Sequence, residues 1–174
     1  MNQNVKSEIW SWVKLIVSAL VIAFILKTFI FQVALVNQIS MEPTLHEGQI
    51  LIISKLNYLL GNPQRGDIIV LKDNVEKKLL IKRTIGLPGE TIEIKNDKAY
   101  INGSELNPDY TAEPTYDNGF LPTKLPDNKY FAMGDNRTHS RDSRSDTVGL
   151  IDRSNIVGKA VFRIWPLNKI GVIR

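Results

Sequence analysis

The chain of 174 residues contains no cysteine and only two histidines, His46 and His139. The absence of thiols excludes disulfides, thiol catalysis and metal sites built on cysteine. Two histidines are too few for a zinc site with three histidine ligands, and we expect neither a metal nor an organic cofactor. Histidine is also the common proton acceptor for a serine nucleophile, and it is nearly absent from this chain.

The chain also lacks an internal repeat and any long linker rich in proline, glycine or serine, which favours one compact domain plus an appendage. Its 43% hydrophobic and 23% charged residues are typical of folded proteins. A net charge of +4 suits an anionic membrane surface as well as nucleic acid and does not choose between them.

A long apolar run extends from Ile9 to Val36, with charges only at Lys14 and Lys27. A membrane-spanning helix needs about 20 mostly apolar residues, so we predict a transmembrane signal-anchor helix over residues 9–33. A cleaved signal peptide is one alternative, but its apolar run is shorter and no Ala-x-Ala cleavage pattern follows here. A helix buried in the core of the protein is the other alternative.

The flanking residues suggest an orientation for this span. Lys6 and Lys14 favour a cytoplasmic N-terminus of residues 1–8, and Trp10 and Trp12 suit a membrane interface. We therefore predict a single-pass protein of the cell membrane whose residues 34–174 form an extracytoplasmic domain.

Short segments rich in β-branched and aromatic residues, separated by turn residues, follow Pro43. They predict an all-β domain of barrel or sandwich type, with a hairpin around Asn96-Asp97. Residues 102–128, which hold four prolines, read as a loop-rich insertion. The expected strands are 49–54, 67–72, 79–85, 91–95, 98–103, 129–134 and 159–165.

The segment ISMEPT places Ser40 just behind the apolar run. Glu42 precedes a proline and is therefore expected to be extended, which fixes the backbone next to Ser40. Ser40 is a candidate nucleophile, and an ordinary turn beside the membrane is the alternative interpretation.

A second segment, LLIKRTIGLPGE, places Lys82 and Arg83 on opposite faces of an expected strand. At least one of these cations must then share a face with Leu80 and Thr84. Burial lowers the pKa of a lysine, and a neutral lysine is a competent general base. A solvated lysine on an edge strand is the alternative.

The third segment, FAMGDNRTHSRDSR, is a dense polar loop after a strand. It reads either as a well-paired surface loop or as the support of an active site. His139 could instead join Ser40 in a Ser-His-Asp arrangement, but Lys82 would then be unexplained. Its expected ion-pair network consists of Asp135, Arg137, Arg141, Asp142 and Arg144.

Taken together, these segments resemble the type I signal peptidases, membrane-anchored Ser–Lys endopeptidases that remove signal peptides from exported proteins. The likeness is to the short, single-span Gram-positive form and covers nearly the whole chain. It implies a mainly β fold, with an antiparallel β-sheet catalytic core, a small inserted β or loop region and one N-terminal transmembrane helix. The matching stretches are SMEPTL, GDIIVLK, IKRTIGLPGE, GDNRTHSRDSR and VGKAVFRIWP.

The resemblance implies a role for each residue of the site. Ser40 would be the nucleophile, its backbone N–H a donor to the oxyanion, and Lys82 the general base. Met41 would lie beside the substrate cleft. The supporting residues would be Ser140, which orients the Lys82 amine, together with Arg83, Asp135, Asp142 and Arg144, which form the structural network.

The chain departs from the family pattern at Gln38, where a small residue is usual. Where relatives carry serine at this position, its hydroxyl completes the oxyanion hole. The amide of Gln38 could replace that donor or obstruct the cleft, and losing one donor typically costs about 10²–10³-fold in rate.

The partners implied are signal peptides of secreted preproteins, the lipid bilayer and the export machinery, with no nucleic acid. Two alternatives belong to other classes. One is a catalytically impaired relative that binds exported chains without cutting them. The other is a cytoplasmic Ser–Lys self-cleaving regulator with a DNA-binding region, for which the apolar first forty residues leave no room.

Overall fold

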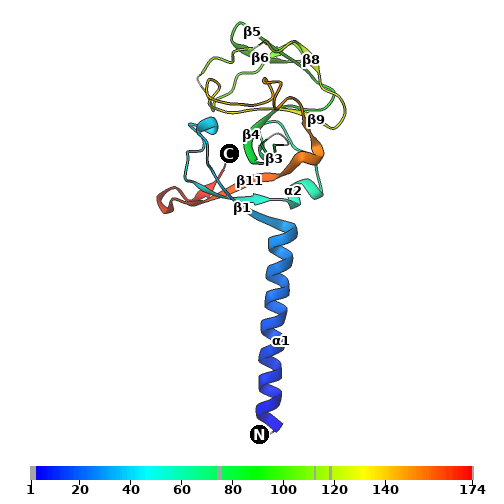
Figure 1. The fold of residues 1–174 in the computed structure, drawn as a ribbon, viewed down its shortest axis with the longest axis vertical. Coiled ribbons are helices and arrows are strands. Elements are labelled where there is room, and N and C mark those ends of the chain that lie inside the picture. Colours follow the sequence, from blue (N-terminus) through cyan, green and yellow to red (C-terminus); the bar gives the residue numbers. More distant parts are fainter. Residues whose placement is uncertain (1–2, 74–75, 112, 118, 174) are drawn as a thin grey trace.

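A long apolar helix precedes the β-rich part of the molecule. The computed structural model describes residues 3–73, 76–111, 113–117 and 119–173. Helix α1 (Gln3–Ile25) continues into the π-helical turn η1 (Leu26–Ile30), and both project away from the strands (Figure 1). The segment Glu8–Ile30 has a mean hydropathy of 2.3, and none of it is buried against the rest of the chain. Its length and composition are sufficient to cross a membrane.

The helix ends earlier than the sequence suggested. Residues 31–33, predicted as helical, instead begin strand β1 (Phe31–Leu35), which pairs antiparallel with β2 (Ile50–Ser54). This pairing extends from Phe31 opposite Ser54 to Leu35 opposite Ile50, so long-range hydrogen bonds decide the local structure. The division into residues 1–8, 9–33 and 34–174 stays a prediction.

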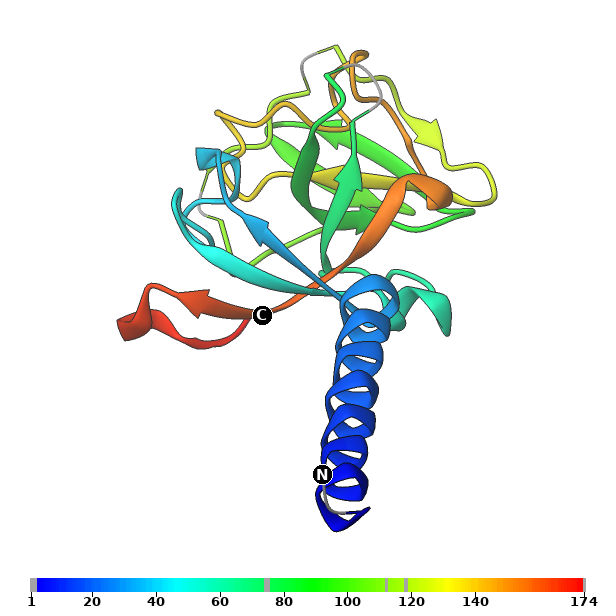
Figure 2. The same ribbon diagram turned by 60° about the horizontal axis from the view of Figure 1, so that its bottom comes forward.

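Most strands of the described residues form one antiparallel sheet in the order β1-β2-β11-β3-β4-β9-β10, with β12 paired to β11. The prediction of a mainly antiparallel β fold is therefore confirmed. Figure 2 shows that the sheet is strongly twisted and that the hairpin of β11 and β12 projects to one side. The remaining bounds are β3 (Ile68–Lys72), β4 (Leu79–Gly86), β9 (Lys129–Met133), β10 (Ile151–Asp152), β11 (Ile156–Trp165) and β12 (Gly171–Val172).

A smaller sheet lies on the side of the molecule opposite α1 (Figure 1). Its strand order is β7-β6-β5-β8, from β5 (Thr91–Lys95), β6 (Lys98–Ile101), β7 (Ser104–Glu105) and β8 (Thr123–Lys124). The predicted hairpin around Asn96-Asp97 is confirmed, since both residues have positive φ, as a two-residue turn of this kind requires. The described residues of the 102–128 segment contain only the two short strands β7 and β8.

The core of the described residues consists of three apolar clusters. Alternate residues of β3 enter different clusters, with Ile68 and Val70 in one and Ile69 and Leu71 in another. Both faces of β3 are therefore buried, and β4, its neighbour, is buried along almost its whole length. Side chains of either face of β4 consequently lie away from bulk water, including two cations. Four short helical turns complete the fold, η2 (Ile39–Met41), α2 (Leu56–Leu59), η3 (Arg153–Asn155) and η4 (Leu167–Lys169).

Candidate active site

Ser40 lies in the single helical turn η2, between extended residues on both sides. Gln38 has φ −144° and ψ 149°, and Glu42 has φ −66° and ψ 144°. The extended Glu42 is the conformation expected before a proline. Met41 is almost completely buried in an apolar cluster and anchors the turn. Ser40 itself is 5% exposed, so its hydroxyl is held in place rather than free in solvent.

Lys82 is the side chain that reaches this hydroxyl. A hydrogen bond of 2.7 Å joins Lys82 Nζ to Ser40 Oγ, across 42 residues of sequence. Lys82 stands in β4 opposite Ile69 of β3, and only 1% of it is exposed. The structure therefore brings together the two candidate residues that the sequence analysis placed in separate motifs.

Burial changes the acidity of Lys82. Loss of hydration disfavours the ammonium form and lowers the pKa of Lys82 from 10.5 to about 8. The negative charge of Asp142 opposes this shift, whereas the positive charges of Arg141 and Arg144 add to it. At pH 7 roughly a tenth of the molecules carry a neutral amine at this position. Such an amine can accept a proton from a hydroxyl 2.7 Å away.

The loop after β9 holds the Ser40 turn from the other side. The Asn136 N–H donates to the Ser40 carbonyl at 3.1 Å, and Asn136 Nδ2 donates to the Ile39 carbonyl at 3.3 Å. A Cβ added to Gly134 would lie 2.3 Å from both Ser140 Oγ and the Ser40 carbonyl oxygen, so only glycine permits this approach. Neither Gly134 nor Asn136 was among the predicted site residues, although both lie in the motif GDNR.

Arg83, on the opposite face of β4 from Lys82, forms a buried ion pair with Asp135. Arg83 Nη2 lies 2.7 Å from Asp135 Oδ2, and both side chains are at most 4% exposed. The Thr44 hydroxyl donates to the same carboxylate at 2.6 Å. Tyr110, from the 102–128 segment, covers the guanidinium at 4.0 Å. Four distant parts of the chain are thus fixed around one charge pair.

A second buried ion pair joins Asp142 and Arg144, at 2.9 Å. Asp142 also accepts the Gly134 N–H at 3.0 Å. Burial alone would raise the pKa of the Asp142 carboxyl, but the hydrogen bonds and charge of Arg144 outweigh it, and the pKa is lowered. The carboxylate therefore stays ionised and keeps a negative charge near Lys82.

The described hydrogen bonds of Ser140 and His139 are made to residues other than Ser40 and Lys82. Ser140 Oγ accepts the Gly134 N–H at 3.1 Å. A hydrogen bond from the Ser140 side chain also helps to lower the pKa of the Asp142 carboxyl. A direct contact of Ser140 with Lys82 stays a prediction. The exposed ring of His139 lies 2.9 Å from Thr138 Oγ1 and 3.3 Å from Asn136 Oδ1. The described contacts of Ser40 Oγ thus favour the lysine over a histidine triad.

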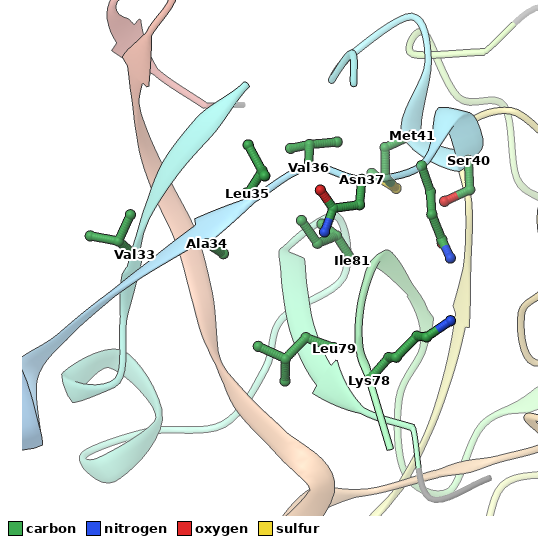
Figure 3. A pocket seen from close by; sticks show the side chains of 11 residues that line it. Val33, Ala34, Leu35, Val36, Asn37, Ser40, Met41, Lys78, Leu79 and Ile81 are labelled. Atoms are coloured by element: carbon green, nitrogen blue, oxygen red, sulfur yellow. The ribbon is translucent and has the colours of Figure 1, made fainter. Parts of the chain in front are cut away.

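A groove of about 460 Å³ leads along the surface to Ser40 (Figure 3). Its walls come from the end of β1 and the start of β4, with Met41 beside Ser40. In the described sheet β1 is an outer strand paired only with β2. The ladder between β4 and β9 begins only at Arg83, so Leu79–Lys82 is paired on one side. Both walls therefore present backbone groups that an extended peptide can pair with.

A second hollow of about 360 Å³ adjoins Ser40 on its other side. Gln38, Ser40, Glu47, His139 and Arg141 contribute to it. Gln38 is exposed and lines both hollows. Ser40 consequently borders both hollows.

Residues 9–165 match the family described as "Signal peptidase, peptidase S26". The chain belongs to this family. It is similar to "Signal peptidase I" of Bacillus licheniformis, with 39% identity over 97% of this chain and 95% of the relative. It is also similar to "Signal peptidase I P" of Bacillus subtilis subsp. natto, with 41% identity over 95% and 94%.

A solved signal peptidase I structure from Enterococcus faecalis V583 matches with a TM-score of 0.49 and 33% identity, over 57% of this chain and 97% of that one. Family membership and the Bacillus relatives support signal peptidase I activity and a peptidase reaction. Among the described residues, no group of three or more histidine or acidic side chains is arranged to hold a metal ion.

Proposed function

We propose that the protein is a membrane-bound serine endopeptidase that removes N-terminal signal peptides from exported preproteins with a Ser40–Lys82 dyad. The observation that carries this proposal is the 2.7 Å contact between Lys82 Nζ and Ser40 Oγ, made by a buried lysine with a lowered pKa. A base of this kind removes the need for histidine. The expected site needs no metal or organic cofactor.

The proposed reaction begins with an extended signal-peptide segment that pairs with the edges of β1 and β4. Small side chains at its −1 and −3 positions enter shallow pockets along the groove. Ser40 Oγ attacks the scissile carbonyl while the neutral Lys82 amine takes the hydroxyl proton. Lys82 then gives this proton to the leaving amine, and water hydrolyses the acyl-enzyme.

The oxyanion of the tetrahedral intermediate would be stabilised by the backbone N–H of Ser40. This N–H is among the first of a helical turn, where amides have no acceptor within the turn. We propose the side-chain amide of Gln38 as the second donor, because Gln38 lines both hollows that meet at Ser40.

The proposed supporting residues hold Ser40 and Lys82 in position. Arg83 and Asp135 fix β4 to the loop after β9, and Asp142 with Arg144 fixes the same loop around Gly134. Ser140 would orient the Lys82 amine, and Met41 would border the cleft.

The anchor would place the groove at the bilayer surface. Val33, at the near end of the groove, is only three residues beyond the end of the apolar segment at Ile30. A signal peptide also carries an apolar segment, so both reactants would be concentrated in one membrane. We propose a single-pass topology with the N-terminus in the cytoplasm, and cooperation with the export machinery.

The test is cleavage of a preprotein with an Ala-x-Ala site in lipid or detergent. Wild type is expected to cut, whereas Ser40→Ala and Lys82→Ala are expected to lose cleavage. The exposed positions Ser104 and Lys124, changed to alanine, serve as matched controls and keep full activity. Wild-type protein that is folded and binds the preprotein without cutting it would contradict the proposal and favour the non-cutting relative.

Gln38→Ala is expected to slow the same cleavage by about 10²-fold if its amide donates to the oxyanion. The loss should fall on kcat more than on KM, because the oxyanion exists only after attack. Equal cleavage by Gln38→Ala would mean that this side chain is not the second donor, and faster cleavage would mean that it obstructs the cleft.

A further inference from the structure

The junction between the apolar helix and the sheet contains a third hollow, of about 740 Å³, separate from Ser40. Its lining residues come from the end of α1, from η1, from β1, and from β2 and the residue that follows it. Figure 1 shows the junction of these elements at the root of the helix. One wall is the last part of the helical segment, with Ala23 and Leu26, and the other is formed by Val33 and Ile52 of β1 and β2. These four apolar side chains can cover the upper part of a hydrocarbon chain.

The polar rim of this hollow is cationic. Two of its eight lining residues are Lys27 and Lys55, and none is acidic. Lys55 Nζ donates one hydrogen bond, to the Thr28 carbonyl at 3.0 Å, which brings it to the same helical turn as Lys27. An ammonium has three donors, so Lys55 can still bind an anion.

The depth of Lys27 makes an anion at this place favourable. Lys27 lies three residues before the end of the apolar segment Glu8–Ile30, which is about 5 Å along a helix axis. A cation at that depth is costly unless it reaches the interface or meets a negative group. The main-chain hydrogen bond from Lys55 N–H to the Ile30 carbonyl, at 2.8 Å, holds the second lysine at the same level.

We infer that this hollow binds one anionic phospholipid from the leaflet on the side of the β domain. The phosphate lies between Lys27 and Lys55, and the start of an acyl chain packs on Ala23, Leu26, Val33 and Ile52. The cationic rim attracts the phosphate, and the apolar walls bind the acyl chain. Together they favour an anionic lipid over a free anion. Val33 also lines the groove that leads to Ser40, so the bound lipid lies beside the path of the substrate. The inference goes beyond the proposed peptidase reaction and requires only that Glu8–Ile30 spans a bilayer.

The test is lipid retention by the full chain, measured by native mass spectrometry after extraction from bilayers of equal phosphatidylglycerol and phosphatidylcholine. Recovery of the protein from the bilayer fraction reports the span separately. We expect one retained phosphatidylglycerol, with its preference over phosphatidylcholine reduced about fivefold in Lys27→Gln and in Lys55→Gln, and about 25-fold in the double variant. Lys27→Arg and Lys55→Arg are expected to keep the preference, as is the distant control Lys124→Gln.

Three results would overturn the inference. The first is equal retention of the two lipids by wild type. The second is a preference for phosphatidylglycerol that falls as much in Lys124→Gln as in Lys27→Gln and Lys55→Gln. The third is displacement of the lipid by inorganic phosphate alone, since the hollow would then be a phosphate site without an acyl contact. Each of these measurements is independent of preprotein cleavage, so a failure here leaves the Ser40–Lys82 proposal unaffected.

Discussion

Lys82 and Arg83 are neighbours in β4, both almost completely buried, yet they meet opposite surroundings. On one face Lys82 contacts the Ser40 hydroxyl, and burial lowers its pKa to about 8. On the other face Arg83 meets the carboxylate of Asp135 at 2.7 Å. A buried lysine without a carboxylate in contact can lose its proton and act as a base, whereas an arginine stays charged and, paired with a carboxylate, cross-links the fold.

The largest expected effect comes from removing the base. Lys82→Met is expected to reduce cleavage about 10⁴-fold or more, because Ser40 loses its proton acceptor. The same change should stabilise the fold, since the difference between a pKa of 10.5 and about 8 corresponds to about 3 kcal/mol for the buried ammonium. Thermal or urea unfolding beside the cleavage assay measures both.

The stabilisation has a defined pH range. It is fully present below about pH 8, where folded wild type must bury the ammonium, and it disappears as the pH approaches 10.5. A Lys82→Met protein that is less stable than wild type at pH 7 would show that the ammonium is not destabilising, and the contrast with Arg83 would fail.

Breaking the Arg83–Asp135 ion pair on the other face of β4 is expected to destabilise the fold. Arg83→Met leaves the Asp135 carboxylate buried without its partner and should lower the free energy of unfolding by about 3–5 kcal/mol. Adding Asp135→Leu should recover part of this loss, because no buried charge then remains unpaired. The control is Arg65→Met, whose partly exposed pair with Glu90 should contribute no more than about 1 kcal/mol. A loss no larger than that of the control would contradict a cross-linking role.

The pH dependence of cleavage tests the lowered pKa of Lys82 directly. Only the neutral amine accepts a proton, so kcat/KM should rise about tenfold per pH unit at low pH and level off above about pH 8. Rates across this range, with folding checked by circular dichroism, give the midpoint. A midpoint near the ordinary lysine value of 10.5 would mean that burial does not tune this group.

The smallest expected effect concerns a charge that acts on Lys82 from a distance. The negative charge of Asp142 raises the pKa of Lys82, so Asp142→Asn should move the midpoint of the pH profile to lower pH, by about one unit or less. The half-buried Asp152→Asn, which removes an equal charge from a pair with Lys129, should leave the midpoint unchanged. A shift to higher pH in Asp142→Asn would contradict the electrostatic interpretation.

Much of the fold followed from local patterns in the sequence. The apolar segment, the main strands and the Asn96-Asp97 hairpin each depend on residues adjacent in the chain. Residues 31–33 were predicted as helical but lie in β1, because they suit a helix or a strand and the antiparallel partner β2 decides between them.

Of the candidate site, the sequence by itself determined the residue types and the alternation that puts Lys82 and Arg83 on opposite faces of one strand. It could not determine which cation reaches Ser40, that Asn136 holds the Ser40 carbonyl, or that Gly134 must lack a side chain. Those contacts join residues dozens of positions apart, and sheet register and the twist between strands set their distances. Only the tertiary structure therefore decided that the cation reaching Ser40 is Lys82, a residue able to act as a base, and that Arg83 becomes a cross-link.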